Sequence, residues 1–369
     1  MRVLHAAALL RPPIGVVNQM QWEQDAALLL QLPWDVRVFC PQGAMAASGI
    51  CHYSDHVHAG QLRGVHKAAA WWALRREYYA WLSSQLTDYD VILLRYYPHD
   101  PLQLAFLRGA SNPVYMVHHA LEGPELAGAG GWMGKLRAAL ENVLGPKAIR
   151  AAAGIIGVTS EIVTYELVRA RDEDKPTFIY PNGIMYDGAI IPDSRTDTPQ
   201  LLFVASGFAP WHGLDLLLAS IHQCQDDFVL HVVGDVSEVD KRAAQGDARI
   251  HFHGRLSHDE ISALAARCVV GLSSLALDRN GMAEACTLKV RQYLMLGLPV
   301  YAGYKDVFPA TFPYYRQGPC DVRAILEFAA EHARTSREVI SVAAHGYIDK
   351  RELLRNMYEG LQRRRAGHV

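Results

Sequence analysis

The sequence lacks the features that mark secreted, membrane-spanning and nucleic-acid-binding proteins. Its 369 residues include only six cysteines, which are scattered and form no Cys-x-x-Cys pair, so we predict free thiols in a reducing compartment. No apolar run approaches the roughly 20 residues that span a bilayer. The formal net charge is only −2, which gives no electrostatic footprint for a nucleic-acid partner. These absences favour a compact protein of the cytoplasm.

Two further signals are missing. No Gly-x-Gly-x-x-Gly follows the first predicted strand, which disfavours a nicotinamide-dependent enzyme. His251 and His253 share one face of a predicted strand, but no carboxylate or cysteine stands at ligand spacing beside them. We therefore expect neither a metal centre nor a bound cofactor.

Short apolar runs alternate with helical stretches twice over, which predicts an α/β protein with two parallel-sheet domains. The predicted strands are 2–9, 36–40, 91–94, 114–117 and 154–158 in the first half, and 201–204, 229–233, 250–252, 269–272 and 300–302 in the second. Turn residues between 180 and 192 mark the hinge. We predict a first domain over 1–184, completed by a C-terminal helix within 346–369, and a second domain over 185–345. Ligands of such sheets bind at the carboxyl ends of the strands.

The most informative segment is 278–301, which reads as a polar loop, a helix and a buried strand. Glu284 lies just before the helix, Thr287 is the predicted N-cap, and Gly297 is predicted to end the helix. The N-terminus of a helix offers unpaired N–H groups and the positive end of the macrodipole, which suits a phosphate or diphosphate. Lys289 adds a full positive charge beside it.

This segment resembles the donor-binding motif of retaining GT-B glycosyltransferases of family 4. In that family a Glu, seven residues and a second Glu flank the helix start. The first acid, matched here by Glu284, holds hydroxyls of the transferred sugar, and the second holds the ribose of the nucleotide. Gln292 stands in place of the second Glu, and its amide oxygen can accept a ribose hydroxyl without charge assistance. The resemblance implies that Lys289, with the backbone at Thr287 and Leu288, stabilises the diphosphate.

The stretch from Val204 to Gly213 resembles the first strand and loop of the family's second domain. Many members have Arg at the position of Gly207 and Lys at that of His212. A branch that resembles bacterial capsular and exopolysaccharide transferases instead reads Trp-His-Gly, as this chain does. The resemblance implies donor contacts from Gly207, Phe208 and His212, with His212 giving the diphosphate a hydrogen bond or a charge.

Further matches extend along the second half. Tyr-Pro-Asn-Gly-Ile at 180–184 is similar to the family's interdomain turn. Arg279 lies in the loop before the segment that carries Glu284 and is expected to help Lys289 and His212 stabilise the diphosphate. Arg255 and Leu256, after a predicted strand, are expected near the nucleobase.

The first domain is expected to carry the acceptor. Gly15 permits either a turn or close approach of a ligand to the backbone. The resemblance implies a histidine near the transferred sugar in this loop, matched by His118 or His119. Because strand neighbours face opposite sides, only one of the two can point into the cleft. Glu122 is either a proton acceptor for the acceptor hydroxyl or a solvated loop acid. Arg95 either binds an acidic or lipid-phosphate acceptor or stacks on the neighbouring tyrosines.

Two segments mix aromatic and basic side chains, as a helix on anionic headgroups does. The first is 62–86, and the second is 128–137. Their aromatic residues either lie on a membrane or pack into the first domain. The side chains concerned are Trp71, Trp72, Tyr78, Tyr79 and Trp81 with Arg63, Lys67, Arg75 and Arg76, and then Trp132 and Met133 with Lys135 and Arg137.

Together these patterns predict the GT-B fold, with two Rossmann-like domains facing across a cleft and a C-terminal helix crossing back to the first. The resemblance implies metal-independent transfer of a sugar, with retention, from a nucleotide-diphosphate sugar to a hydroxyl of a glycan or lipid-linked saccharide. It places the enzyme in bacterial cell-surface polysaccharide synthesis, in the cytoplasm or at the inner face of the membrane. The alternative is a non-catalytic GT-B scaffold or partner subunit, since Gly207, His212 and Gln292 depart from the commonest pattern.

Overall fold

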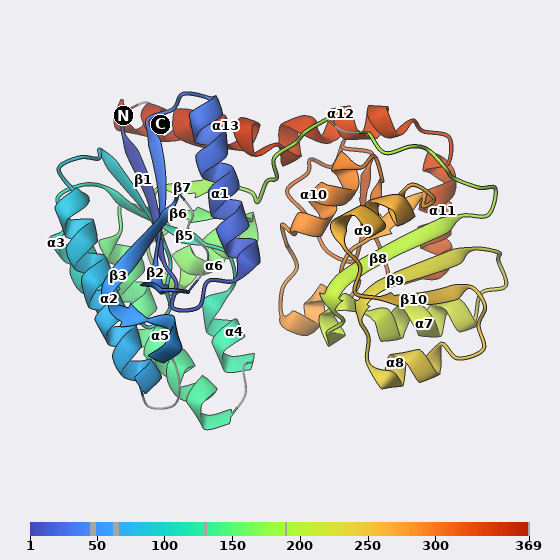
Figure 1. The fold of residues 1–369 in the computed structure, drawn as a ribbon, viewed down its shortest axis with the longest axis horizontal. Helices are drawn as coiled ribbons and strands as arrows, with labels where there is room; N and C mark the ends of the chain where they lie inside the picture. Colours follow the sequence, from blue (N-terminus) through green and yellow to red (C-terminus); the bar gives the residue numbers. More distant parts are fainter. Residues whose placement is uncertain (45–48, 62–65, 129–130, 189, 368–369) are drawn as a thin grey trace. The chain divides into compact units, whose positions relative to one another are not determined.

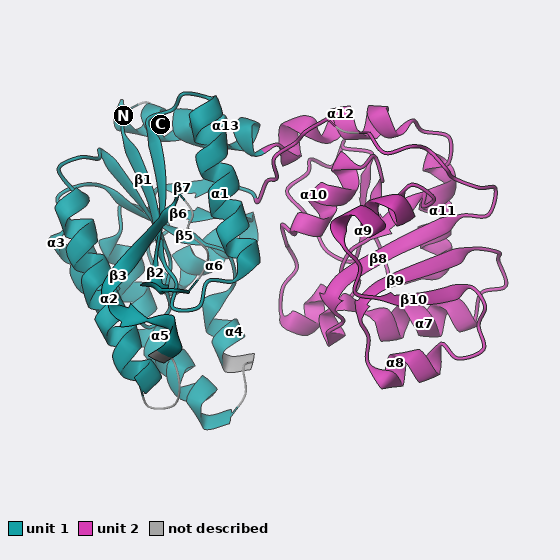
Figure 2. Cartoon of the chain, in the orientation of Figure 1, with its two compact units in different colours: residues 1–181, 350–369 teal, residues 182–349 magenta. Residues whose placement is uncertain are grey.

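The computed structural model describes residues 1–44, 49–61, 66–128, 131–188 and 190–367. The chain forms two compact units, coloured separately in Figure 2. Unit 1 comprises Met1–Pro181 and Lys350–Val369, and unit 2 comprises Asn182–Asp349. Among the described residues, no helix combines the length and apolarity needed to cross a bilayer.

The division falls slightly before the boundary predicted at residue 184. The Ile184 N–H donates to the Ile348 carbonyl oxygen (2.9 Å), and Ile184 forms an isolated parallel bridge with Asp349. This backbone pairing places Ile184 in unit 2, whereas the sequence had assigned it to the first domain.

The described residues of unit 1 form a seven-stranded parallel sheet in the order β3-β2-β1-β4-β5-β6-β7 (Figure 1). The strands are β1 (Val3–Ala8), β2 (Trp34–Gln42), β3 (Cys51–His58), β4 (Val91–Arg95), β5 (Val114–His118), β6 (Gly154–Gly157) and β7 (Thr177–Ile179). The helices are α1 (Ile14–Leu29), η1 (Ala59–Gln61), α2 (His66–Gln85), α3 (Pro101–Gly109), α4 (Glu122–Gly128), α5 (Gly131–Ala151), α6 (Ser160–Ala170) and α13 (Lys350–Arg365). Every residue of β1 is buried, as expected for a central parallel strand with helices on both faces.

The C-terminal helix α13 packs on unit 1 beside α1, as Figure 1 shows. Its buried face includes Leu354 and Met357. The Tyr358 hydroxyl donates to the Met1 carbonyl oxygen (2.8 Å), and its ring meets Trp34 edge-on at 6.4 Å. The predicted return of this helix to the first domain is confirmed.

The described residues of unit 2 form a six-stranded parallel sheet in the order β10-β9-β8-β11-β12-β13. The strands are β8 (Gln200–Gly207), β9 (Val229–Asp235), β10 (Ile250–Gly254), β11 (Val270–Leu272), β12 (Val300–Ala302) and β13 (Tyr315–Gln317). The helices are η2 (Pro210–His212), α7 (Leu214–His222), α8 (Glu238–Ala243), α9 (His258–Ala265), η3 (Leu277–Asn280), α10 (Leu288–Met295), α11 (Val322–His332) and α12 (Arg337–Ile348). Two parallel α/β units confirm the predicted fold class.

Each sheet reverses its strand order once, between β1 and β4 in unit 1 and between β8 and β11 in unit 2. Ligands of open α/β sheets bind outside the carboxyl ends of the strands at such a reversal. The fold therefore directs attention to the loops after these four strands. All six cysteines are free thiols, as predicted.

Candidate functional site

In unit 2 the loops after β8 and β11 are tied together at the reversal point. The Leu275 N–H donates to the His212 carbonyl oxygen (2.9 Å), and the Ala276 N–H donates to that of Trp211 (3.3 Å). Gly213 between them has φ 73°, and an added Cβ would lie only 3.1 Å from the Ala276 side chain. Glycine is therefore required for the two loops to approach.

The start of α10 rests on a buried ion pair. Arg291 donates to both oxygens of Asp306 (2.6 Å each), and its Nε donates to the Asn182 carbonyl oxygen (3.1 Å). Both charged side chains are fully buried, and the bidentate geometry satisfies them. The pair fixes α10 against the turn at residue 182.

Thr287 is the N-cap residue of α10, as predicted, but its side chain makes no capping hydrogen bond. Its hydroxyl instead forms a hydrogen bond with the Tyr304 hydroxyl (3.0 Å), which also bonds Ser273 (2.8 Å). The side chain of Thr287 therefore leaves the N–H groups of the first turn, beginning at Leu288, uncapped. Such groups favour an anion at this end of the helix.

Lys289 lies in the first turn of α10, and its ammonium group is buried. Nζ has no hydrogen-bond partner among the described residues and stands 6.0 Å from the centroid of the Phe203 ring. Burial lowers the pKa of Lys289 to about 8. An uncompensated buried cation is destabilising in the protein alone, and an anion bound beside it would relieve that cost.

His212 is positioned as a neutral hydrogen-bond donor. Its Nδ1 accepts from the Ala209 N–H (2.9 Å), so the proton of the neutral ring is on Nε2. Burial and the nearby positive charge of Lys289 lower the pKa of His212 to about 4. The ring of Phe208 meets it edge-on at 5.5 Å. Of the two roles left open by the sequence, this geometry favours the hydrogen bond over the charge.

Glu284 is held in place next to the same helix. Its Oε1 accepts from Lys305 Nζ (2.7 Å), and the Ala285 N–H donates to the Lys305 carbonyl oxygen (3.0 Å). The Glu284 side chain is 14% exposed, so the carboxylate remains within reach of a ligand. Gln292 is half-buried one turn after Lys289, on the same side of α10.

Two of the predicted donor arginines are already paired. Arg279 donates to both oxygens of Asp215 (2.8 and 3.0 Å) and to the Pro210 carbonyl oxygen (3.0 Å). Arg255 forms an exposed pair with Asp235 through Nε (2.9 Å). The first pair shapes the loop after β8, and the second links the ends of β10 and β9.

The remaining donor candidates also lie at strand ends. Gly207 ends β8 and is exposed, and an added Cβ would meet nothing nearer than 4.0 Å. Packing therefore does not dictate glycine there. Leu256 is half-buried just after β10.

In unit 1, Arg95 ends β4 at the reversal point. It makes no ion pair or hydrogen bond with the described residues, and burial lowers its pKa to about 10. The tyrosines that follow it face other arginines: the Tyr97 ring lies 4.2 Å from Arg75, and the Tyr96 ring lies 5.8 Å from Arg169. The structure therefore does not have the predicted stack of Arg95 on these rings.

The two histidines at the end of β5, His118 and His119, face opposite sides, and the structure distinguishes them. His118 is fully buried, stacks on Tyr96 at 4.3 Å and turns Nδ1 toward Glu122. His119 is half-buried, and its Nε2 has no hydrogen-bond partner among the described residues. Burial and the positive charge of Arg95 lower the pKa of His119 well below its usual value. His119 is thus the neutral histidine beside Arg95.

Of the remaining acceptor-side candidates, Glu122 is buried, whereas Gly15 has open space around it. Glu122 begins α4, is buried and contacts His118, so the solvated-loop alternative does not hold. Gly15 lies in the first turn of α1 without a positive φ, and no atom lies within 4 Å of an added Cβ. The turn alternative for Gly15 therefore does not hold either.

The aromatic residues of α2 divide between core and surface. Tyr78 and Tyr79 are buried, and Arg75 is buried against Asp100 (2.6 Å). Trp72 is 44% exposed, and on α5 Trp132 is 74% exposed. Arg63, which the sequence grouped with them, lies outside the described residues.

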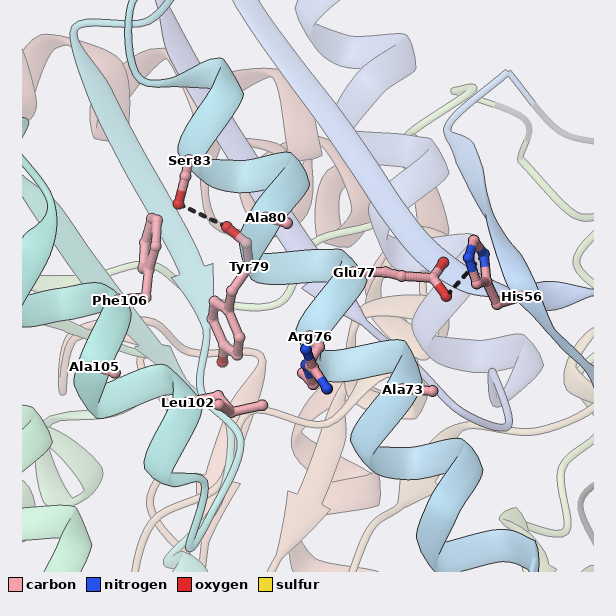
Figure 3. A pocket seen from close by; sticks show the side chains of 10 residues that line it. All are labelled: His56, Ala73, Arg76, Glu77, Tyr79, Ala80, Ser83, Leu102, Ala105 and Phe106. Atoms are coloured by element: carbon pink, nitrogen blue, oxygen red, sulfur yellow. Dashed lines mark hydrogen bonds and ion pairs between the residues drawn. The ribbon is translucent and has the colours of Figure 1, made fainter.

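A hollow of about 690 Å³ lies between β3, α2 and α3 (Figure 3). The His56–Glu77 ion pair (3.6 Å) stands at one side of it, and Ser83 donates to the Tyr79 carbonyl oxygen (2.7 Å) at the other. None of the predicted site residues lines this hollow, so it is not part of the candidate site.

Sequence reasoning missed the partners that hold the site. Lys305, Tyr304 and Asp306 position Glu284, Thr287 and Arg291, but they come from the segment after β12. The sequence spacing of these three residues does not predict the contacts, because the contacts form only when β12 returns the chain to the start of α10.

Comparisons with known proteins agree with this arrangement. Residues 198–308 match the family described as Glycosyl transferases group 1. No curated protein matches the chain in sequence.

Solved structures are similar over nearly the whole chain. The apo form of the lipopolysaccharide outer core galactosyltransferase WaaB has 13% identity and a TM-score of 0.67, covering 99% of this chain and 100% of that chain. A sucrose-phosphate synthase from Thermosynechococcus elongatus has 17% identity and a TM-score of 0.66, with the same coverage. HepE from Anabaena, in complex with UDP and glucose, has 16% identity and a TM-score of 0.60, covering 98% and 99%. The fold is GT-B. The match to the glycosyltransferase family covers residues 198–308, which lie within unit 2.

The buried charge of Lys289 generates a stability prediction. At pH 7 the side chain is protonated in both the folded and the unfolded chain, so Lys289→Met should raise the free energy of unfolding by roughly 1–3 kcal/mol. The folded protein releases this proton at about pH 8 and the unfolded chain at about 10.5, so wild type should approach the variant in stability across that window. Denaturant unfolding at pH 7 and pH 10 measures both effects.

Lys241→Met provides the matched control, since that lysine is exposed on α8. Its stability should stay within about 0.5 kcal/mol of wild type. A Lys289→Met variant less stable than wild type at pH 7 would contradict the burial argument.

Proposed function

We propose that the chain transfers a sugar from a nucleotide-diphosphate sugar to a hydroxyl of a glycan or lipid-linked saccharide. The observation that carries this proposal is the buried, unpartnered ammonium of Lys289 in the first turn of α10. Departure of the diphosphate must be stabilised in such a reaction, and preorganised electrostatics usually supplies the largest share. A cation and a helix N-terminus, at the point where the sheet reverses, suit that task.

The proposed roles follow from the contacts. Lys289 and the N–H groups at Leu288 bind the diphosphate, with the Nε2–H of His212 as a further donor. The carboxylate of Glu284 orients the sugar hydroxyls, and the amide of Gln292 accepts from the ribose. Arg279 acts indirectly, because its pairing with Asp215 shapes the loop that carries His212.

Uridine diphosphate sugars are the first donors to test. HepE, whose fold this chain shares, has been solved with UDP and with UDP-glucose. The sequence resemblance supplies the remaining elements of the proposal: retention at the anomeric carbon, no metal at the donor, and a cytoplasmic role in bacterial cell-surface polysaccharide synthesis.

A non-catalytic scaffold is the second candidate, and Gln292 is the observation that favours it. Against it stands the unrelieved cost of burying Lys289, which a protein that no longer binds a diphosphate would have no need to retain.

The decisive experiment is a thermal-shift screen of UDP-glucose, UDP-galactose and UDP-N-acetylglucosamine, followed by an assay of donor hydrolysis and transfer. A donor with a Kd of about 1 mM or better should raise the melting temperature when present in large excess. Glu284→Ala and Lys289→Met should each lower turnover roughly 100-fold or more, as loss of a group that stabilises transition-state charge does.

Lys241→Met is again the control and should turn over like wild type. Donor binding without turnover, even with lipid-linked acceptors present, would support the scaffold. No binding of any nucleotide sugar would overturn the site in unit 2.

The surface of unit 1 favours a lipid-linked acceptor. Exposed apolar side chains follow one side of α5, and a hollow of about 600 Å³ opens between α5 and α2, with Lys67 and Arg137 among its lining. We use the name α5 surface for five exposed apolar residues of α5 together with Trp72 of the neighbouring α2. The α5 residues are Trp132, Met133, Leu136, Leu140 and Val143. Apolar side chains with cations beside them suit an anionic lipid surface. Arg95 lies at the reversal point without an ion pair or hydrogen bond to the described residues, and it would receive the acceptor's phosphate.

Leu136→Glu should weaken sedimentation with phosphatidylglycerol vesicles about 10-fold or more, because it places a carboxylate in the α5 surface. Val239→Glu is the matched control, since Val239 is equally apolar and 67% exposed but lies in unit 2. Failure of wild type to sediment, or equal sedimentation of both variants, would contradict membrane contact through α5.

Gly15→Ala tests whether the start of α1 meets a ligand. The fold has room for the methyl group, and alanine in place of glycine within a helix stabilises by roughly 0.5–1 kcal/mol. We expect a slightly higher melting temperature together with a higher KM for acceptor and an unchanged Kd for donor. A variant with wild-type kinetics for both substrates would show that no ligand approaches Gly15.

A further inference from the structure

Three side chains of the kinds that bind metals converge inside unit 1, whereas the donor candidates belong to unit 2. His118 ends β5, Glu122 begins α4, and Glu166 lies in α6. One ligand atom from each side chain lies within 4.8 Å of the other two. The side chains of His118 and Glu166 are fully buried, and that of Glu122 is 11% exposed.

The spacing of these atoms differs from that of a direct hydrogen bond. Nδ1 of His118 lies 3.2 Å from Oε1 of Glu122 and 3.6 Å from Oε1 of Glu166. In the same unit, Nδ1 of His5 lies only 2.7 Å from Oε1 of Glu23. Ligand atoms held about 2.1 Å from one tetrahedral ion stand about 3.4 Å from each other. The His118 distances bracket that value.

The charges of the cluster are also out of balance. Arg169 donates to Glu166 through Nε and to Glu141 through Nη1 (2.6 Å each). With Glu122, three carboxyl groups therefore surround one guanidinium. Oε2 of Glu122 and Oε1 of Glu166 have no hydrogen-bond partner among the described residues. The charge of Glu122 also acts on Arg95, so full ionisation of the three carboxyl groups would leave one negative charge uncompensated, and a divalent cation can supply the opposite charge.

We propose that His118, Glu122 and Glu166 bind one divalent transition-metal ion, with Zn²⁺ the best match to one nitrogen and two carboxylate donors. Three protein ligands leave a fourth position for water. The ion joins the loop between β5 and α4 to α6. His119 lies in that loop, so the ion is a positioning element for His119 and is independent of the donor.

The test is metal binding to the full-length chain. We expect the purified protein, stripped with chelator and dialysed, to take up about one Zn²⁺ per chain and to show the visible absorption of tetrahedral Co²⁺ when Co²⁺ replaces it. Glu122→Gln should weaken Zn²⁺ binding roughly 100-fold, as loss of a direct ligand should exceed the 10–100-fold typical of outer partners. Glu125→Gln, an exposed acid in the same helix, should bind Zn²⁺ like wild type.

The competing state is a shared proton. Burial raises the pKa of Glu122 to about 8 and that of Glu166 to about 7, so protons can compensate the same charges. No uptake of Zn²⁺ or Co²⁺ by wild type, or equal uptake by Glu122→Gln, would overturn the metal site. Titration of the wild-type chain with Zn²⁺ tests the metal site even if Glu122→Gln fails to fold. None of these measurements depends on glycosyl transfer.

Discussion

The uncompensated ammonium of Lys289 is the interaction around which the site in unit 2 is organised. Keeping a charge buried without a partner is unfavourable, and it persists only where the surrounding structure is rigid enough to hold it. That rigidity comes from the bidentate ion pair of Arg291, in α10, with Asp306. It also comes from Tyr304, whose hydroxyl forms a hydrogen bond with that of Thr287. The same contacts leave the first turn of α10 without a side-chain cap. The positive charge of Lys289 and the uncapped N–H groups therefore lie together at the start of α10, where they can bind an anionic ligand.

Unit 1 presents a related arrangement at its own reversal point. Arg95 makes no ion pair or hydrogen bond with the described residues, although the charges of Glu122 and Glu23 act on it, and its own charge acts on the neutral imidazole of His119. On the other side of the sheet, His118 is enclosed by acidic side chains. Two consecutive histidines therefore have opposite roles, because adjacent residues of an extended chain face opposite sides of the sheet. An acceptor that carries a phosphate would meet the side with Arg95.

The sequence was sufficient to predict the alternation of strands and helices, and so two parallel-sheet units, because buried parallel strands are nearly continuous apolar runs. It also located the loops that carry His212 and Glu284, since motif order follows chain order. The sequence did not predict which of several possible hydrogen-bond partners a side chain contacts. The Thr287 hydroxyl bonds Tyr304 instead of capping α10, and that choice depends on a residue brought back by β12. The buried environment of Glu122 was equally invisible, because Glu166 reaches it from α6.

The three departures from the commonest family pattern are physically connected. Gly207 and His212 stand where many members of the resembled family have cations for the diphosphate. Among the described residues of this region, Lys289 is then a buried cation without a partner, whereas Arg291 is paired with Asp306. A carboxylate at position 292 would stand one turn from Lys289 on the same side of α10, where opposite charges pair. Gln292 avoids that pairing. In the proposed donor site the ammonium would then stay available to the diphosphate, and the amide of Gln292 would accept from a ribose hydroxyl. The loss of one acid therefore follows from the loss of two cations, and together they argue for an adjusted donor site over a decayed one.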